Sequence, residues 1–237
     1  MPYKLYPETA RGKADHGWLN ARHTFSFASW HDPEKIHFGV LRVLNDDRIA
    51  AGMGFGMHPH DNMEIITIPL SGSVRHRDSM GNEGTIGSGE IQVMSAGSGV
   101  THSEFNASRT DELSLFQIWI FPDTKNVTPR YDQWDYSSKE KNNTWTTLIS
   151  PQSVGEGSWI HQDVYMKTGR FDTAETVHIR TRGKGYGLFL MVVEGEINLL
   201  DQSLGARDAI GIWDEDSISI QCTQASRLLL IDLPMNA

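Results

Sequence analysis

The chain reads GMGFGMHPH from residue 52 to residue 60 and VTHSEFN from residue 100 to residue 106. Each stretch carries two metal-ligand side chains at a spacing of two: His58, His60, His102 and Glu104. In a β-strand, side chains at positions i and i+2 point to the same side. Two such pairs on facing strands make a cage of three imidazoles and one carboxylate, which suits a divalent first-row metal. The sequence therefore predicts a mononuclear metal site on a β scaffold.

Residues at fixed distances accompany both pairs. Glu64 and Gly72 follow the first pair, and a turn of small residues, 95–99, precedes the second. Glycine tolerates tight backbone turns, so we expect Gly97 and Gly99 to bring His102 toward the first pair. Asn106 fits either support of the ligands or a turn. The spacing resembles the cupin signatures, in which a glycine-led His-x-His and a later His on separate barrel strands share one metal.

Longer runs resemble the pirin family, and they extend almost from end to end of the chain: residues 22–27, 54–65, 94–104, 212–216 and 230–234. The resemblance implies two cupin domains and one metal in the N-terminal barrel, held by the residues matching His58, His60, His102 and Glu104. Many cupins keep a fourth ligand where this chain has Glu64. The resemblance gives that task to Glu104 and leaves Glu64 without an assigned role.

Strand signals support an all-β fold. Short runs rich in Val, Ile, Leu and aromatic residues alternate with Gly, Asn, Asp and Ser turns, and no long amphipathic helix pattern is present. The runs lie at 38–44, 64–70, 74–77, 90–94, 113–121, 186–193, 196–200 and 227–233. We expect two jelly-roll cupin barrels in tandem with few short helices.

A weak internal repeat supports two domains. The segment 65–77, a strand, Gly72 and a strand, resembles the segment 189–200 around Gly195. The polar stretch 122–143 suits a connector. We place an N-terminal metal-binding cupin at 1–134 and a C-terminal cupin at 135–237. The second lacks the metal ligands, because His178-Ile179-Arg180 stands roughly where His-x-His should be.

Composition sets the remaining limits. The chain has 237 residues, a formal net charge of -9 and a single cysteine, Cys222, which excludes an internal disulfide and agrees with a reducing compartment. The negative charge disfavours direct binding to nucleic acid. No apolar run is long enough to span a bilayer, and no secretory signal is visible, so we expect a cytoplasmic protein without membrane contact.

The chemistry that follows is oxidative. Four protein ligands leave two positions of an octahedral ion open, and the remaining positive charge favours an anionic, chelating oxygen ligand. A flavonol offers its 3-hydroxyl and 4-carbonyl. The closest family resemblance, to bacterial quercetin 2,3-dioxygenases, implies ring opening by dioxygen with release of carbon monoxide. Glu104 is the candidate proton acceptor. Fe(II) is our preferred metal, with Mn, Ni, Cu, Co and Zn as alternatives.

Other interpretations stay open. The pirin family also includes regulators, which implies that the metal could serve as a redox sensor whose state controls binding to a transcription factor or a metabolic enzyme. A cupin isomerase or sugar-binding cupin is a third option. His23 and Phe25 are candidates for the substrate pocket, although alternating aromatics also suit a core strand. The other histidines lack paired spacing and are treated as ordinary: His16, His31, His37, His76 and His161.

Overall fold

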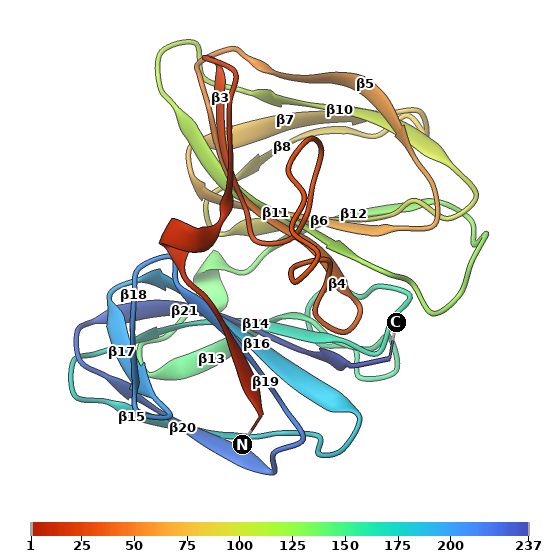
Figure 1. Cartoon of the computed structure of the whole chain (residues 1–237). Coiled ribbons are helices and arrows are strands. Elements are labelled where there is room, and N and C mark those ends of the chain that lie inside the picture. Colours follow the sequence, from red (N-terminus) through yellow and green to blue (C-terminus); the bar gives the residue numbers. More distant parts are fainter. Residues whose placement is uncertain (1, 237) are drawn as a thin grey trace.

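The computed structural model describes residues 2–236, and these residues form two β-barrels that lie one above the other (Figure 1). The helical content of the described chain is two single-turn 3-10 helices, at Glu8–Ala10 and Ser137–Lys139. Both barrels consist of one large and one small antiparallel sheet. The structure therefore confirms the predicted all-β, two-cupin fold.

The first barrel pairs a seven-stranded sheet, ordered β12-β9-β6-β11-β4-β3-β2, with a four-stranded sheet, ordered β5-β10-β7-β8. Its strands are β2 (Gly12–Asp15), β3 (Leu19–His23), β4 (Leu41–Ile49), β5 (Gly54–His60), β6 (Glu64–Ser71), β7 (Ser73–Asp78), β8 (Glu83–Gly87), β9 (Glu90–Ser95), β10 (Val100–Asn106), β11 (Leu113–Ile120) and β12 (Arg130–Asp135).

The second barrel pairs a six-stranded sheet, ordered β1-β19-β16-β21-β14-β13, with a four-stranded sheet, ordered β15-β20-β17-β18. Its strands are β1 (Tyr3–Tyr6), β13 (Thr144–Ile149), β14 (Tyr165–Phe171), β15 (Thr176–Arg180), β16 (Tyr186–Glu194), β17 (Glu196–Leu199), β18 (Gln202–Gly205), β19 (Ala209–Trp213), β20 (Ser217–Cys222) and β21 (Ser226–Pro234).

The same strand order recurs in both barrels. The small sheet of the first barrel has the strand order of the small sheet of the second when ten is added to every strand number. Five strands of the large sheets correspond in the same way. The glycines expected from the repeat occupy equivalent turns: Gly72 joins β6 to β7 and Gly195 joins β16 to β17, both with positive φ, at 77° and 87°. Only glycine adopts such a φ without steric cost.

The end strands of the large sheets break this sequential order. β1 comes first in the chain but pairs with β19, so it lies among the C-terminal strands, where Figure 1 shows it in red beside blue strands. β12 takes the corresponding place beside β9. The stretch 122–143 is therefore more than the connector that its polar composition suggested. The predicted boundary between residues 134 and 135 falls at the end of β12, and we retain it as a proposal, with β1 crossing to the second barrel.

The two large sheets pack against each other through one apolar core. β6 shows how its strands divide their side chains: Ile66 and Ile68 belong to this shared core, whereas Ile65 belongs to a separate cluster inside the first barrel. Tyr6 of β1 joins the shared core, with ring centroids 5.5 Å from Phe25 and 5.3 Å from Phe189. The exchanged strand thus anchors one barrel to the other.

Truncating this anchor should weaken the whole protein. Tyr6 is 3% exposed, so Tyr6→Ala leaves a cavity and should lower the free energy of unfolding by about 3 to 5 kcal/mol. Tyr3 on the same strand is 39% exposed, and Tyr3→Ala should change the free energy of unfolding by only about 0.5 kcal/mol. Urea unfolding of both variants measures the difference. Equal effects would show that β1 is not an anchor.

Candidate metal centre

The pairing of β5 with β10 brings the three predicted histidines together. His58 lies directly opposite His102, and His60 lies opposite Val100. The ring centroids are 4.9 Å apart for His58 and His60, 4.5 Å for His58 and His102, and 4.9 Å for His60 and His102. One ring nitrogen of each lies within 4.8 Å of the others, a geometry that can hold a metal ion.

Glu104 lies in a second group that shares His102. A register shift between His102 and Glu104 interrupts the pairing with β5, while on the other side Glu104 lies opposite His76 of β7. The ligand atoms of His76, His102 and Glu104 all lie within 4.8 Å of one another. Glu104 therefore approaches the histidine cluster from the side of His102 and His76.

Sequence reasoning missed His76. It is 0% exposed, its Nε2 lies 3.2 Å from Asp78 Oδ2, and its ring stacks on that of Tyr131 with centroids 4.8 Å apart. The available signal was the pair His76 and Asp78, which have the same spacing of two on β7 as the predicted ligand pairs. His76 is thus a neighbour of the candidate centre and not an isolated surface histidine.

Two of the imidazoles, those of His60 and His102, are held in the neutral form that binds metals. Burial, followed by the charges of His102 and His58, lowers the pKa of His60 to about 4. Burial, followed by the charges of His58 and His76, lowers the pKa of His102 to about 3. At neutral pH both rings therefore present lone pairs instead of positive charge.

The hydrogen bonds of the rings test whether a cation fits. Nδ1 of His58 lies 2.8 Å from the carbonyl oxygen of Gly56, which can only accept, so Nδ1 donates and Nε2 is the nitrogen available to a metal. His60 Nε2 and both ring nitrogens of His102 are buried without a hydrogen-bond partner among the described residues. Buried polar atoms are rarely left unpaired unless a function requires it. The donor set therefore fits a divalent transition metal.

Three neighbouring side chains orient Glu104. Thr67 Oγ1 and Gln92 Nε2 each donate to Oε1 at 2.9 Å, and Gln117 Nε2 donates to Oε2 at 2.8 Å. Glu104 itself is 2% exposed. Donors on both oxygens fix the direction of the Glu104 side chain, as supporting residues do around metal ligands.

Glu64 lies on the opposite side of β6 from this network. Thr67 faces the interior of the first barrel, and Glu64 is three residues away, so its side chain points to the other face. Ser95 Oγ donates to Glu64 Oε2 at 2.7 Å, and burial raises the pKa of Glu64 to about 7. The side chain is therefore a buried structural group outside the histidine cluster.

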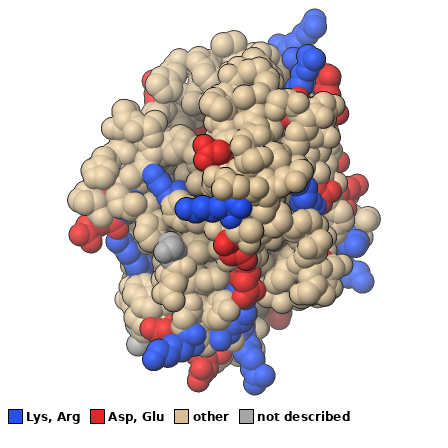
Figure 2. Space-filling view, turned by 90° about the vertical axis from the view of Figure 1, so that its right-hand side faces the viewer, with Lys and Arg blue, Asp and Glu red and all other residues tan. Residues whose placement is uncertain are grey.

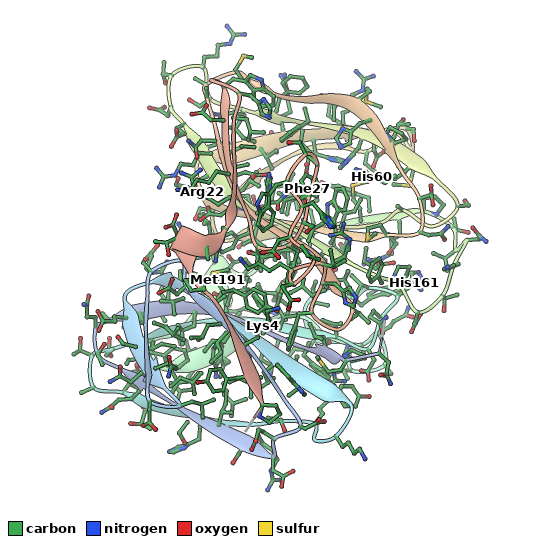
Figure 3. All side chains as sticks on the ribbon, viewed as in Figure 1. Lys4, Arg22, Phe27, His60, His161 and Met191 are labelled. Atoms are coloured by element: carbon green, nitrogen blue, oxygen red, sulfur yellow. The ribbon has the colours of Figure 1, made fainter. Side chains whose placement is uncertain are left out.

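The two predicted pocket residues lie in different places. Phe25 is 1% exposed and packs on Phe189 in the shared core, away from the histidine cluster. His23 is buried beside Phe27, whose ring lies 5.3 Å from that of Trp119, and Trp119 lies 4.9 Å from the ring of His60. Figure 3 labels Phe27 and His60 within the first barrel. Phe27 and Trp119, both half-buried, thus form the aromatic approach to the cluster.

Asn106 shapes the turn that follows β10. Its side-chain nitrogen donates to the carbonyl oxygens of Ile49 at 2.9 Å and Asp111 at 2.8 Å, and its oxygen accepts from the backbone of Ser108. Ser108 and Asp111 belong to the loop 107–112, and Ile49 is the last residue of β4. Of the two roles considered, the structure supports the turn.

The second barrel has an apolar interior where the first has histidines. In β15, Val177 and Ile179 are buried, whereas His178 and Arg180 are exposed. His178 Nδ1 lies 2.9 Å from Ser219 Oγ on the outer face of β20. The inward positions of β20 carry Ile218, Ile220 and Cys222, which belong to the same apolar cluster.

The surface shows no strong segregation of charge in the view of Figure 2. Acidic and basic side chains are interspersed over that face of the molecule. Within residues 2–236, no helix has the length and apolarity needed to cross a bilayer.

Comparison with known proteins agrees with this architecture. The pirin family model matches residues 6–120, and the model of the quercetinase C-terminal cupin domain matches residues 147–233. A quercetin 2,3-dioxygenase of Escherichia coli strain K12 is 42% identical over 94% of this chain and 95% of its own. A pirin-like protein of Caulobacter vibrioides is 38% identical over 93% and 95%.

Solved structures give the same result. The crystal structure of YhhW from Escherichia coli has a TM-score of 0.94 and 40% identity, covering 98% of both chains. A structure of the bacterial pirin YhhW in complex with nickel(II) has a TM-score of 0.93 and covers 98% and 99%. The fold and the histidine cluster together define a two-barrel cupin. Within that class, the chain belongs to the pirin family.

The neutral histidines predict a pH-dependent stability of the metal-free protein. His102 protonates near pH 6.5 in the unfolded chain but only near pH 3 when folded, so the folded state binds fewer protons between these values. Protonation of His102 therefore favours the unfolded chain, and the free energy of unfolding should decrease as the pH falls from 7 to 5. Urea unfolding at both pH values should show a smaller loss for His102→Gln. The exposed control His178→Gln should retain the wild-type difference, and an unchanged difference in His102→Gln would contradict the assignment.

Proposed function

We propose that this protein is a metal-dependent dioxygenase that opens the ring of flavonols such as quercetin and releases carbon monoxide. The observation that carries the proposal is the convergence of three imidazoles whose ring nitrogens can share one ion. His58 is half-buried and so remains reachable from solvent, whereas His60 Nε2 and the ring of His102 are buried. A reachable metal site serves a reaction, because a structural site is closed by protein ligands.

We propose one divalent transition metal, with His58, His60, His102 and Glu104 as its ligands. Imidazole nitrogen and carboxylate oxygen suit several first-row ions. The nickel(II) complex of the YhhW relative supports a divalent ion as the cofactor. Fe(II) stays our preferred metal for dioxygen chemistry. Among the alternatives, nickel has the support of a relative's structure.

The aromatic approach suits a planar substrate. Phe27 and Trp119 present ring faces and edges beside His60, where a flavonol can lie with its 3-hydroxyl and 4-carbonyl toward the cluster. A bound divalent metal lowers the pKa of a coordinated hydroxyl and so favours the electron-rich enolate that reacts with dioxygen. The relatives named quercetin 2,3-dioxygenase support this substrate class.

Glu104 is our candidate for the group that accepts the hydroxyl proton. Its carboxylate is ordered by Thr67, Gln92 and Gln117; Oε1 accepts two of these bonds and Oε2 one, so Oε2 keeps acceptor capacity. A general base needs a fixed position within hydrogen-bond reach of the proton that it removes. The network supplies that fixed position.

Removing one imidazole tests the metal dependence. His58→Ala should lower the bound metal in elemental analysis and reduce oxygen uptake on quercetin in proportion, by at least about tenfold, since support of a metal site is worth 10- to 100-fold even outside the ligands. The exposed His178→Ala serves as the control and should keep both values. Full oxygen uptake by a metal-poor His58→Ala protein would rule out the proposed centre.

Glu104→Gln separates proton transfer from metal binding. The amide cannot accept a proton, so turnover should fall by about 10²- to 10⁴-fold in protein that still holds its metal. Glu64→Gln changes another buried glutamate of the same barrel and should retain activity. The decay of the long-wavelength flavonol band measures turnover. Near-normal turnover in metal-loaded Glu104→Gln would show that Glu104 is not the base.

The regulatory interpretation predicts a different outcome of the same assays. A redox sensor of the pirin type would bind metal through the same residues but neither consume oxygen nor bleach the flavonol. Its affinity for a protein partner would instead depend on the oxidation state of the metal. Metal-loaded wild-type protein without turnover would therefore favour that function over the dioxygenase.

A further inference from the structure

The second barrel contains a cavity of about 240 Å³ that opens between β14, β15 and β21. Its apolar wall consists of Tyr165, Ile179 and Leu230, and its polar rim adds Lys167, Arg180, Arg182 and Asp232. Neither the metal centre nor the shared core uses these side chains. The cavity is therefore a separate feature of the barrel that lacks the histidine cluster.

Its position corresponds to the mouth of the metal centre in the first barrel. Trp119, which contacts His60, pairs with Ile65, seven residues before Gly72. Asp232 pairs with Leu188, seven residues before Gly195. Asp232 thus occupies the place of Trp119, and β15 occupies the place of β5. The two barrels open at equivalent points with different chemistry.

Arg182 holds the polar side of this mouth in place. Its Nε donates to Asp232 Oδ1 at 2.9 Å, its Nη1 lies 2.7 Å from Asp163 Oδ1, and its guanidinium lies 3.9 Å from the ring centre of Tyr186. Tyr186 also donates to Asp163 Oδ2 at 2.8 Å. With these partners, Arg182 and its two carboxylates, Asp163 and Asp232, form a fixed frame that carries one net negative charge.

Two cations at the rim stay unpaired. In the described range 2–236, no direct side-chain hydrogen bond or ion pair joins Lys167 or Arg180 to another residue, although the Lys167 charge acts on Asp232 from a longer distance. The Lys167 ammonium lies 5.9 Å from the ring centre of Tyr165. The whole chain carries a net charge of -9, so a local positive excess is unusual here. Such an excess beside an apolar wall suits an anion with an apolar body.

We propose that this cavity binds a single-ring aromatic carboxylate, with the carboxylate between Lys167 and Arg180 and the ring against Ile179, Leu230 and Tyr165. The size fits one ring, because sites for drug-sized ligands occupy about 300 to 1,000 Å³. A monoanion matches the rim, since Asp232 opposes a second negative charge. The proposal does not depend on the dioxygenase activity.

Benzoate is the probe, and amide chemical shifts of zinc-loaded, full-length protein locate its binding. We expect saturable shifts around residues 165–167, 179–182 and 230–232 at millimolar concentrations. Benzamide, which lacks the charge, and acetate, which lacks the ring, should bind at least about tenfold more weakly, a difference of about 1.4 kcal/mol. Absence of saturable shifts, shifts confined to the histidine cluster, or equal binding of either analogue would overturn the proposal.

Matched variants identify the charges responsible. Lys167→Met and Arg180→Gln should each weaken benzoate binding by about fivefold or more, as expected for loss of a charged partner. Lys184→Met and Arg75→Gln remove the same charges at exposed positions outside the cavity and should leave binding unchanged. Thermal unfolding confirms that all four variants fold. If the cavity variants and the controls lost the same benzoate affinity, the effect would come from the net charge of the protein, and the proposed site would be wrong.

Discussion

The antiparallel pairing of β5 with β10 is the contact on which the candidate centre depends. It places His58 opposite His102 at a fixed separation, and the strand period of two then turns His60 to the same side. A shift of one residue in this register would turn the ligands of one strand outward. The register itself is secured from the other side, where β7 pairs with β10 and the buried His76 lies opposite Glu104. The small sheet therefore sets the positions of the ligands before any metal binds.

Part of this arrangement could be predicted from local sequence, because strand periodicity and glycine turns are local properties. The spacing of His58 and His60 and of His102 and Glu104 was enough to predict two converging pairs, and the glycine between two apolar strands was enough to predict the repeat. The buried strands β6, β11, β16 and β21 also stood out, since their side chains are apolar on both faces.

Other features depend on contacts between residues far apart in the chain. β1 is four residues long and has no marked apolar period, yet it completes the sheet of the opposite barrel. β12 contains Asp132, Gln133 and Asp135 and resembles a polar connector, although β9 pairs with all six of its residues. His76 and the three donors around Glu104 come from four different strands. The spacing of two between His76 and Asp78 was a local signal, but which strands lie beside which has no signal in adjacent residues, so the sequence alone could not supply these contacts.

The two barrels show how one strand order supports opposite interiors. Inside the first, His60 and His102 have buried nitrogens without protein partners, and an unsatisfied buried polar group costs about 1 to 3 kcal/mol. The second barrel has Val177, Ile179, Ile218 and Ile220 at its inward positions and avoids that cost. Because the large sheets of both barrels share one core, the apolar barrel and the exchanged strand β1 can offset the instability of the metal-free first barrel. The second barrel thus supports the metal centre without contacting it, because it stabilises the fold of the first barrel in the metal-free protein.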